Sequence, residues 1–570
     1  MVTMSSPRLS QAPYPHVHLS SLFERTAQHR ANQVALVNSV TGAQYTFREA
    51  WEASSRLARR LQEDGIKKGD RVAIFAPNSP EWVIAFHAIL LAGATATTMN
   101  PLYKERELEH QFEDCTPTAV FCSGLVKDVA QPVWEGVGAK KDDRPGPFYI
   151  VEEAWALAGG SPGPHSPVAI NPLKDIAILP YSSGTTGGPK GVMLTHHNVA
   201  SNVRQTLATG MVDGYAVLID FLPFFHIYGM VVLMNVGLTM GARQVIMPRF
   251  DMEQFLELTQ RHKATNLYVV PPAMLALANI PGLEKYDLSS VRFIMSGAAP
   301  LAPDVGRRVE ERFGTKVVQG YGMTETSPVT HVNILDRNKP GSVGPPVADT
   351  RQRIVDMQSG AELGIGEVGE LLIEGPQVMK GYWNRPDATG ESILEGPDYD
   401  ASRQRSDDPL ALPFWHDRWL RTGDIASMDD EGYVTIHDRA KEMIKFRGYQ
   451  IAPAELEAVL VEHPSIVDAA VIPKYDDEAG EVPKAFVVVR DGQDVGVEEI
   501  QAFVSARVAP YKKIREVEFI PAIPKSLSGK ILRRELIEQE RAKAGDRSGG
   551  VERDITRPCP GKLKRQKRLL

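Results

Sequence analysis

The chain has 570 residues, more than one hydrophobic core usually holds, so we expect at least two domains. Its composition, 43% hydrophobic and 24% charged, is that of a globular protein and argues against a disordered or fibrous chain. The formal net charge of −7 argues against nucleic acid as the main partner.

Cysteine usage and apolar stretches bear on the environment of the protein. The three cysteines, Cys115, Cys122 and Cys559, include no C-x-x-C pair, which disfavours a disulfide framework or structural zinc and suits a reducing cytoplasm. The first fifteen residues lack the apolar core of a signal peptide. The longest apolar stretches, 82–99 and 228–242, are interrupted and do not supply the ~20 clean residues of a membrane span. We therefore predict a cytoplasmic monomer or homodimer without a transmembrane segment, and peripheral membrane contact stays open.

From residue 22 to about residue 438, helical patterns alternate with short β-branched runs. The spacing predicts helices over 47–64 and 82–92 and strands over 71–75, 119–121 and 267–270. Such alternation indicates an α/β architecture with largely parallel sheets. We place a large domain at 22–438, preceded by an N-terminal extension at 1–21.

A loop rich in glycine and hydroxyl side chains joins two apolar runs at 176–179 and 192–195. It reads S-S-G-T-T-G-G-P-K-G over 182–191. Glycine lets the backbone approach a ligand, and free N–H and hydroxyl groups donate to anionic oxygens, so we predict a polyphosphate cradle. A P-loop needs glycine before its lysine and a hydroxyl after it, whereas here Pro189 precedes Lys190 and a second strand follows. A flexible linker is the alternative.

A second motif, Q-G-Y-G-M-T-E-T over 319–326, follows an apolar pair. We therefore expect it where a strand ends, the place where α/β sheets bind ligands. Two glycines flank Tyr321, whose flat ring suits stacking on a purine, and Glu325 beside a phosphate loop is a natural Mg²⁺ ligand. A surface turn is the alternative.

Three more segments are informative only when they are considered together with the two motifs above. The run L-P-F-F-H-I-Y-G over 222–229 holds His226, which would ordinarily be a core residue. The segment W-L-R-T-G-D places Asp424 just after a turn, where one carboxylate can accept from two ribose hydroxyls or simply face water. The segment S-G-A-A-P over 296–300 is a tight turn after a strand.

From about residue 439 to residue 540 the pattern is that of a smaller α+β domain. Pro453 opens a helix, strands follow at 469–472 and 485–489, and a helix is expected near 497–506. The charged segment K-E-M-I-K-F-R-G-Y-Q over 441–450 lies at the junction, where hinge residues are expected, although a solvated strand edge has the same composition.

Two segments fall outside this pattern. Residues 396–417 are rich in Asp, Arg, Ser and Pro and are expected to form an exposed loop. The tail 541–570 carries ten Lys and Arg against three Asp and Glu, has few large apolar residues, and is predicted to be disordered.

Taken together, the ordered motifs resemble those of the adenylate-forming enzymes, which comprise acyl-CoA synthetases, peptide-synthetase adenylation domains and luciferases. The resemblance runs from about residue 22 to residue 541. It implies a large N-terminal domain of packed mixed sheets and helices with a smaller, mobile C-terminal α+β domain. It also makes 396–417 an insertion.

The resemblance implies a nucleotide site with Tyr321 on adenine, Thr324 at the α-phosphate and Asp424 at the ribose. Glu325 would hold Mg²⁺. The full set implied for the nucleotide is Ser182, Ser183, Gly184, Thr185, Thr186, Lys190, Gln319, Gly320, Tyr321, Thr324, Asp424 and Arg439.

The resemblance also implies the catalytic and acyl-binding residues. Lys530, in P-K-S-L-S-G-K-I, would stabilise negative charge as pyrophosphate leaves. His226 would gate the approach of the carboxylate, and Lys441 would be the hinge. Lys445 and Gln450 would act in adenylate formation, and Arg447 and Gly448 would line a pantetheine tunnel. The acyl pocket would include Tyr228, Met295, Ala298 and Met323.

We therefore expect a ligase that activates a carboxylic acid with ATP and Mg²⁺ and transfers it to coenzyme A. An apolar, methionine-rich pocket suits a medium- or long-chain fatty acid, because methionine adapts to irregular shapes. A 4-coumarate-type ligase is the alternative, as are luciferase-like and peptide-synthetase adenylating enzymes. The last of these is disfavoured because 222–232 contains no Asp to hold an α-amino group.

Overall fold

A computed structural model describes residues 3–12, 14, 16–140, 146–182, 189–399, 415–446, 449–476, 479–526 and 529–545. The chain divides into two compact units. The large unit comprises the described residues of 1–443 together with the segment 525–530, and the small unit comprises those of 444–524 and those from 531 onward. Each unit is described by itself.

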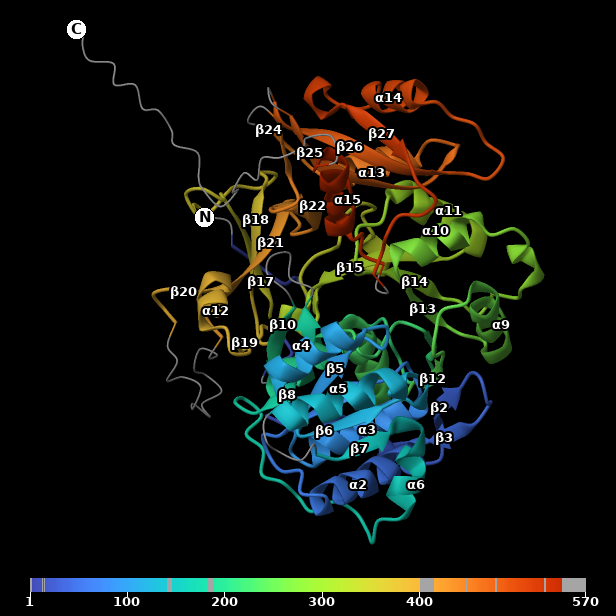
Figure 1. Ribbon diagram of the computed structural model, residues 1–570, viewed down its shortest axis with the longest axis vertical. Coiled ribbons are helices and arrows are strands. Elements are labelled where there is room, and N and C mark those ends of the chain that lie inside the picture. Colours follow the sequence, from blue (N-terminus) through green and yellow to red (C-terminus); the bar gives the residue numbers. More distant parts are fainter. Residues whose placement is uncertain are drawn as a thin grey trace. The chain divides into compact units, whose positions relative to one another are not determined.

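The first sheet of the large unit has the strand order β19-β10-β8-β5-β4-β6-β7, with β9 beside β10. Strands β4 to β8 pair in parallel, whereas β8, β9 and β19 pair antiparallel to β10. The strands are β4 (Arg71–Phe75), β5 (Thr95–Met99), β6 (Ala119–Cys122), β7 (Phe148–Ile150), β8 (Ile176–Ile178), β9 (Tyr181–Ser182), β10 (Lys190–Thr195) and β19 (Gly381–Tyr382). Figure 1 shows the helices that accompany it, which are α2 (Phe47–Glu63), α3 (Pro80–Leu91), α4 (Glu105–Cys115), α5 (Lys127–Lys140) and α6 (Ala154–Gly159).

Helices α2 and α3 pack against each other and follow from their sequences. In α2, Thr46 and Glu49 form a capping box, and one face is buried. In α3, the Ser79 hydroxyl accepts a hydrogen bond from Trp82 N at 3.1 Å, and Pro80 occupies the first turn. Most of α3 is buried, as expected for a helix that is apolar on all faces.

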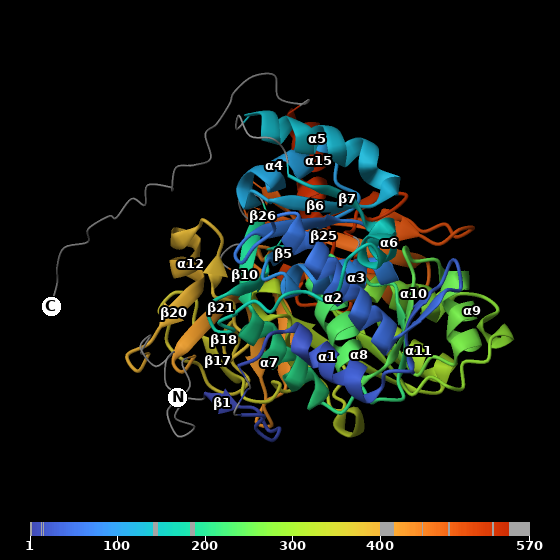
Figure 2. The ribbon, with the colours of Figure 1, turned by 90° about the horizontal axis from the view of Figure 1, so that it is seen from below.

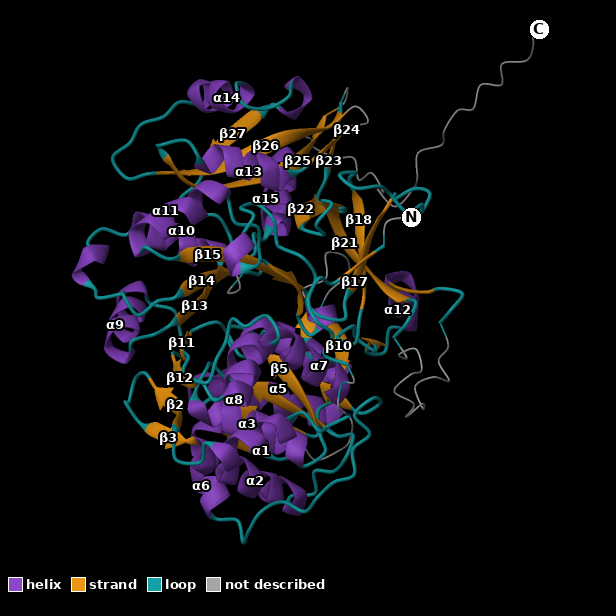
Figure 3. Cartoon of the chain, turned by 180° about the vertical axis from the view of Figure 1, so that it is seen from behind, coloured by secondary structure: helices purple, strands orange, loops and turns teal. Residues whose placement is uncertain are grey.

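The second sheet has the order β16-β15-β14-β13-β11-β12-β2-β3 and is parallel except at its two outer pairs. Its strands are β2 (Val34–Asn38), β3 (Gln44–Thr46), β11 (Val217–Asp220), β12 (Arg243–Ile246), β13 (Asn266–Val269), β14 (Phe293–Ser296), β15 (Lys316–Gly322) and β16 (Val329–Val332). Figure 3 shows the helices α9 (Met252–His262), α10 (Pro271–Asn279) and α11 (Pro303–Phe313) along one side of its strands. Helix α8 (Val236–Met240) packs against α1 (Ser20–His29) and α7 (His196–Leu207), as Figure 2 shows.

The third sheet is antiparallel throughout, so the expectation of largely parallel sheets holds for the first two sheets only. Its order is β1-β17-β18-β21-β20, with β22 beside β21. Its strands are β1 (Met4–Ser5), β17 (Arg351–Val355), β18 (Gly369–Glu374), β20 (Ile393–Glu395), β21 (Arg418–Met428) and β22 (Val434–Arg439), and α12 (Pro386–Ser392) precedes β20. The connection from β21 to β22 is short, which suits antiparallel pairing, whereas parallel strands need a longer crossover. Through β1, part of the N-terminal extension joins this sheet.

The small unit has the strand order β24-β23-β26-β25, with β27 parallel to β26. Its elements are β23 (Ile444–Phe446), β24 (Tyr449–Ile451), α13 (Pro453–Val461), β25 (Ile466–Asp476), β26 (Gly480–Val489), α14 (Val497–Ser505), β27 (Glu516–Phe519) and α15 (Arg533–Gly545). Helix α15 continues past the residue at which we expected a disordered tail, and residues 546–570 lie outside the described residues.

Short 3-10 helices complete the fold at η1 (Gly124–Val126), η2 (Val151–Glu153), η4 (Leu283–Lys285), η5 (Thr324–Thr326), η6 (Leu335–Arg337) and η8 (Pro510–Lys512). Within the described part of the chain, no helix is long and apolar enough to cross a membrane. Most of the expected insertion, residues 400–414, lies outside the described residues.

Candidate active site

The glycine-rich loop joins two strands, as the sequence predicts. Strand β9 ends at Ser182 and β10 begins at Lys190, and these two residues are paired across the antiparallel ladder. A strand–loop–strand connection of this kind differs from the strand–loop–helix of a P-loop. Residues 183–188 lie outside the described residues, and with them the predicted ligands Ser183, Gly184, Thr185 and Thr186.

Lys190 and Glu325 approach the same aromatic side chain. The Lys190 ammonium lies 5.1 Å from the centroid of the Tyr382 ring. The Tyr382 hydroxyl donates to Glu325 Oε1 at 2.9 Å, and Glu325 is buried. Tyr382 therefore links the end of the glycine loop to the predicted Mg²⁺ ligand. One protein carboxylate suits Mg²⁺ when substrate phosphates and water supply the remaining ligands.

The Q-G-Y-G-M-T-E-T motif does not begin at the end of its strand, contrary to our expectation. Parallel pairing with β14 ends at Gln319, but β15 continues to Gly322 and pairs antiparallel with β16. The turn comes later, at Thr324 in η5. The side chain of Gln319 accepts a hydrogen bond from Leu301 N at 3.1 Å and so ties β15 to the segment after β14.

Tyr321, Asp424 and Arg439 form a connected polar group. The Tyr321 hydroxyl donates to Asp424 Oδ2 at 2.5 Å, and Arg439 Nε lies 3.3 Å from Asp424 Oδ1. We had expected Asp424 just after a turn, but it lies within strand β21. Burial raises the pKa of Asp424, while the Arg439 charge and the Tyr321 hydroxyl act in the opposite direction.

Lys530 belongs to the segment that packs with the large unit. Its backbone N–H donates to Ser526 Oγ at 3.1 Å. The preceding Gly529 has φ +80°, and a Cβ there would lie 2.8 Å from Pro272 Cδ, so glycine is required on both counts. Burial lowers the pKa of Lys530 and the Arg439 charge acts in the same direction, whereas the Asp424 charge raises it.

His226 and Tyr228 lie where a loop enters a π-helix, η3 (Tyr228–Asn235). The His226 Nδ1 atom accepts a hydrogen bond from Tyr228 N at 3.3 Å. Burial lowers the pKa of His226 to about 3, and the Lys530 charge acts in the same direction, so the imidazole is neutral near pH 7. The amide of Asn235 donates to Met230 O at 2.8 Å, five residues back, which supports the wide π turn.

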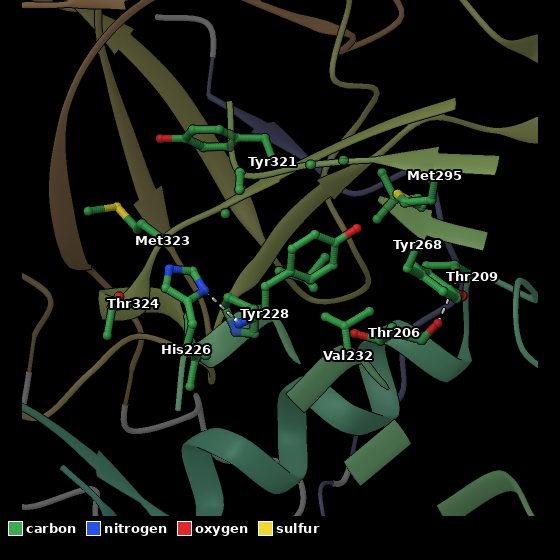
Figure 4. Close-up of a pocket in the computed structure, with 18 of the residues that line it drawn as sticks. Thr206, Thr209, His226, Tyr228, Val232, Tyr268, Met295, Tyr321, Met323 and Thr324 are labelled. Atoms are coloured by element: carbon green, nitrogen blue, oxygen red, sulfur yellow. Dashed lines mark hydrogen bonds between the residues drawn. The ribbon is translucent and has the colours of Figure 1, made fainter. Parts of the chain in front are cut away.

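A cavity connects these groups. About 680 Å³ of space, part of it open to solvent, lies between its walls. Figure 4 shows His226, Met323 and Thr324 at one end and Met295, Tyr268 and Thr206 at the other, with Tyr228 between them. The lining residues are Thr206, Thr209, Met211, His226, Ile227, Tyr228, Val232, Tyr268, Met295, Gly297, Ala298, Gly320, Tyr321, Gly322, Met323, Thr324, Pro328, Val329, Val332 and Lys530.

The S-G-A-A-P turn brings backbone close to the cavity. A Cβ on Gly297 would lie 3.2 Å from Tyr228 Cε1, so only glycine lets the Tyr228 ring rest there without displacement. Ala298 has φ +73°, a left-handed conformation that glycine favours and alanine rarely adopts. Strained backbone conformations of this kind are common at ligand-binding sites.

The predicted hinge and its neighbours lie at the boundary of the units. Lys441 is exposed and belongs to the large unit, whose longer segment ends at Met443. Lys445 lies in the small unit with an exposed side chain, and its backbone N–H donates to Glu481. Gln450 pairs with Lys445 through the backbone of β24. The remaining two predicted residues, Arg447 and Gly448, lie outside the described residues.

Among the residues of the site that were not found from the sequence, four have polar side chains. Tyr382 lies in the G-Y-W segment, whose two consecutive aromatic residues were a usable signal. Thr206 and Thr209 lie at the end of α7, and Tyr268 lies in β13. They gave no signal, because the sequence of a helix end or of a buried strand looks the same whether or not it lines a site. The cavity brings all three together from distant parts of the sequence.

Two family profiles match this chain. The profile of AMP-binding enzymes matches residues 23–383, and the profile of the C-terminal domain of AMP-binding enzymes matches residues 455–530. The chain is 35% identical over 560 residues to a long-chain-fatty-acid–CoA ligase from Bacillus subtilis (strain 168), covering 93% of this chain and 96% of that protein. It is 40% identical over 528 residues to a 4-coumarate–CoA ligase from Petroselinum crispum, covering 90% of this chain and 91% of that protein.

Solved structures share the fold. ATP-bound MatB from Rhodopseudomonas palustris matches with a TM-score of 0.81 and 28% identity, over 92% of this chain and 99% of that chain. The anthranilate CoA ligase AuaEII, in complex with anthranoyl-AMP, matches with a TM-score of 0.80 and 25% identity, over 93% of this chain and 98% of that chain.

Proposed function

Because the chain belongs to the family of AMP-binding enzymes and is an ATP-dependent acid–CoA ligase of the AMP-forming kind, we propose that its acid is a medium- to long-chain fatty acid. The observation that carries this proposal is the apolar share of the cavity lining, to which Val232, Met295 and Met323 contribute. Methionine and valine leave a deformable passage that suits an alkyl chain, and the fatty-acid ligase of Bacillus subtilis is similar over nearly the whole chain.

The proposed first step is attack of the carboxylate on the α-phosphate of ATP, with pyrophosphate as the leaving group. Tyr321 stacks on adenine, and Asp424 accepts from the ribose hydroxyls. Thr324 contacts the α-phosphate. Lys530 offsets the negative charge that builds up between the α-phosphate and the carboxylate. Lys190 offsets part of the charge of the polyphosphate, and Glu325 would hold a Mg²⁺ ion, which would offset more of it when bound.

The proposed second step is transfer of the acyl group to the thiol of coenzyme A, which displaces AMP. His226, neutral near pH 7, stands beside Tyr228 and gates the path of the thiol. We place the hinge for this step at Lys441, close to the boundary of the units, and assign Lys445 and Gln450 to adenylate formation. Arg447 and Gly448 are proposed for the pantetheine path.

Activation of an amino acid fits this cavity poorly. Asp220, the acidic residue just before the segment 222–232, is fully buried and is not among the lining residues. Burial raises the pKa of Asp220 well above its usual range, which disfavours a negative charge there for an α-ammonium group. A 4-coumarate-type ligase is the second candidate, favoured by the 40% identity to the Petroselinum crispum enzyme.

A panel of acids tests the choice between these two. We expect kcat/KM, followed by pyrophosphate release, to rise along straight-chain acids from butyrate towards stearate until the pocket is full. Each buried CH₂ contributes about 0.8 kcal/mol, which is about fourfold in kcat/KM. A maximum on coumarate or caffeate, with uniformly low activity on the alkanoates, would replace the fatty acid by the second candidate.

A further inference from the structure

The end of the cavity distant from the nucleotide residues carries buried hydroxyl groups. The hydroxyls of Thr206, Tyr228 and Tyr268 are buried, and within the described ranges of the chain none forms a well-oriented hydrogen bond, although the Tyr268 hydroxyl lies near the side chain of Asn266. All three residues line the same cavity. In Figure 4, Thr206 and Tyr268 lie together at the end opposite His226 and Thr324.

These groups come from three rigid elements. Thr206 is next to last in helix α7 and is 5% exposed, while Tyr268 lies within strand β13 and is 3% exposed. Tyr228 is the first residue of the π-helix, and Tyr268 is near enough to influence its ionisation. Rigid supports of this kind are typical of a built binding site.

A neighbouring hydroxyl shows the ordinary alternative. The Thr209 hydroxyl donates to Thr206 O at 2.6 Å and is therefore satisfied by the protein itself. Leaving a buried hydroxyl without a partner is unfavourable, and most such groups in folded proteins are paired. Three unpaired hydroxyls at one end of a cavity thus indicate a ligand that pairs with them.

The chemistry of the lining limits what that ligand can be. Hydroxyls both donate and accept, so they suit a neutral hydroxyl or keto oxygen. The cationic or potentially cationic lining residues are Lys530 and His226, and Figure 4 shows His226 at the other end. A second carboxylate at the distant end would therefore lack a counter-charge.

We propose that the preferred acid carries a hydroxyl or keto group at the end of its chain distant from the carboxylate, and that Thr206 and Tyr268, with Tyr228, bind that group. This inference rests on the proposed function, because the inference places the alkyl chain of a fatty acid along the apolar side chains of the cavity. A plain alkyl terminus would leave the three hydroxyls unpaired. The apolar side chains bind the alkyl chain of the acid, and the hydroxyls select the group at its end.

Matched pairs of acids test the proposal in the unaltered enzyme. For each chain length, kcat/KM is measured for the straight-chain acid, its ω-hydroxy form and its keto form, with pyrophosphate release as the readout. We expect the oxygenated form to be favoured about 5- to 100-fold at the length that reaches Thr206. Shorter acids should show no such preference.

Two variants assign the effect to residues. Thr206→Val and Tyr268→Phe keep the side-chain volume and remove the hydroxyl, so each should lower the ratio of oxygenated to plain acid and improve the plain acid. Thr259→Val is the control, because the Thr259 hydroxyl is buried elsewhere and donates to Phe255 O. It should leave the ratio unchanged.

The outcomes separate this inference from the proposed function. If plain acids equal or exceed their oxygenated partners at every length, water satisfies these hydroxyls and the inference is overturned, while the fatty-acid assignment stands. If hydroxycinnamates exceed all aliphatic acids, the fatty-acid assignment fails. In that case a ratio near one for coumarate against cinnamate would overturn the inference as well, and a high ratio lost in Thr206→Val would support it.

Discussion

The two ends of the cavity are built differently. At the nucleotide end, Tyr321, Asp424 and Arg439 bind one another, and Tyr382 donates to Glu325, so the polar side chains are held before any ligand arrives. At the acyl end the buried hydroxyls of Thr206, Tyr228 and Tyr268 form no well-oriented hydrogen bond among the described residues. A fixed nucleotide end suits a constant co-substrate, while the acyl end has its polar groups left over for recognition.

Lys530→Ala should give the largest effect, because we propose that the Lys530 ammonium stabilises the charge that builds up in adenylation. Loss of one electrostatic donor costs about 10²- to 10³-fold in rate. We expect acyl-adenylate formation to fall by that factor while a pre-made acyl-adenylate still reacts with coenzyme A. Lys525→Ala, in the same segment but outside the cavity lining, is the control. Equal loss in both half-reactions would contradict the assignment.

Asp424→Asn tests the fixed end. Asparagine keeps the shape and can still accept from Tyr321, but it loses the ion pair with Arg439. Hydrogen bonds to charged groups contribute about 1.5–3 kcal/mol, so we expect KM for ATP to rise about 10- to 100-fold. The preference among acids should not change. Asp356→Asn, at an exposed turn, is the control, and a changed acid preference would show that the two ends are not separate.

Gly297→Ala tests the acyl end. The new methyl would lie 3.2 Å from Tyr228 Cε1 and 3.3 Å from its hydroxyl, so the ring must move into the cavity. Overpacking of this kind costs about 1–3 kcal/mol. We expect kcat/KM for the longest accepted acid to fall roughly tenfold, with KM for ATP unchanged. Gly390→Ala, where a Cβ meets nothing within 4 Å, should have no effect, and an unaltered acid profile in Gly297→Ala would rule out Tyr228 as a wall.

A pH series separates the stability of the scaffold from the chemistry of either end. Burial lowers the pKa of His87 and His197 to about 3 and that of His18 and His331 to about 4. A lowered folded-state pKa means that stability is fully present above the unfolded value of about 6.5 and is lost as pH falls towards the folded value.

At pH 5 each of these histidines should cost about 2 kcal/mol in the free energy of unfolding, since the unfolded chain binds the proton. The measurement is the midpoint of thermal unfolding from pH 8 to pH 5, which should fall. In His87→Leu the fall should be smaller, although the bond to the Ser20 hydroxyl is lost. A midpoint independent of pH would contradict the buried neutral state of these rings.

Much of the large-scale reading from the sequence is confirmed. The family resemblance is borne out by the matching profiles, and the mixed α/β fold by the matching solved structures. Predicted helices and strands such as 47–64 and 71–75 correspond to α2 and β4. The expectation failed for Asp424, which lies within a strand, and for Gln319–Gly322, where β15 continues beyond its parallel partner.

The sequence by itself indicated most residues of the proposed nucleotide end, because they lie in short motifs whose chemistry is local. Each signal lies within ten residues of sequence: glycines beside a lysine, an aromatic residue between two glycines, and a carboxylate in the segment W-L-R-T-G-D. Only the tertiary structure decided the acyl end. Thr206, Tyr228 and Tyr268 belong to a helix, a π-helix and a strand, and packing of the second sheet against α7 alone makes them neighbours. Hydrophobic burial is non-directional, so a pattern of apolar residues fixes which face is inside without fixing which hydroxyls meet there.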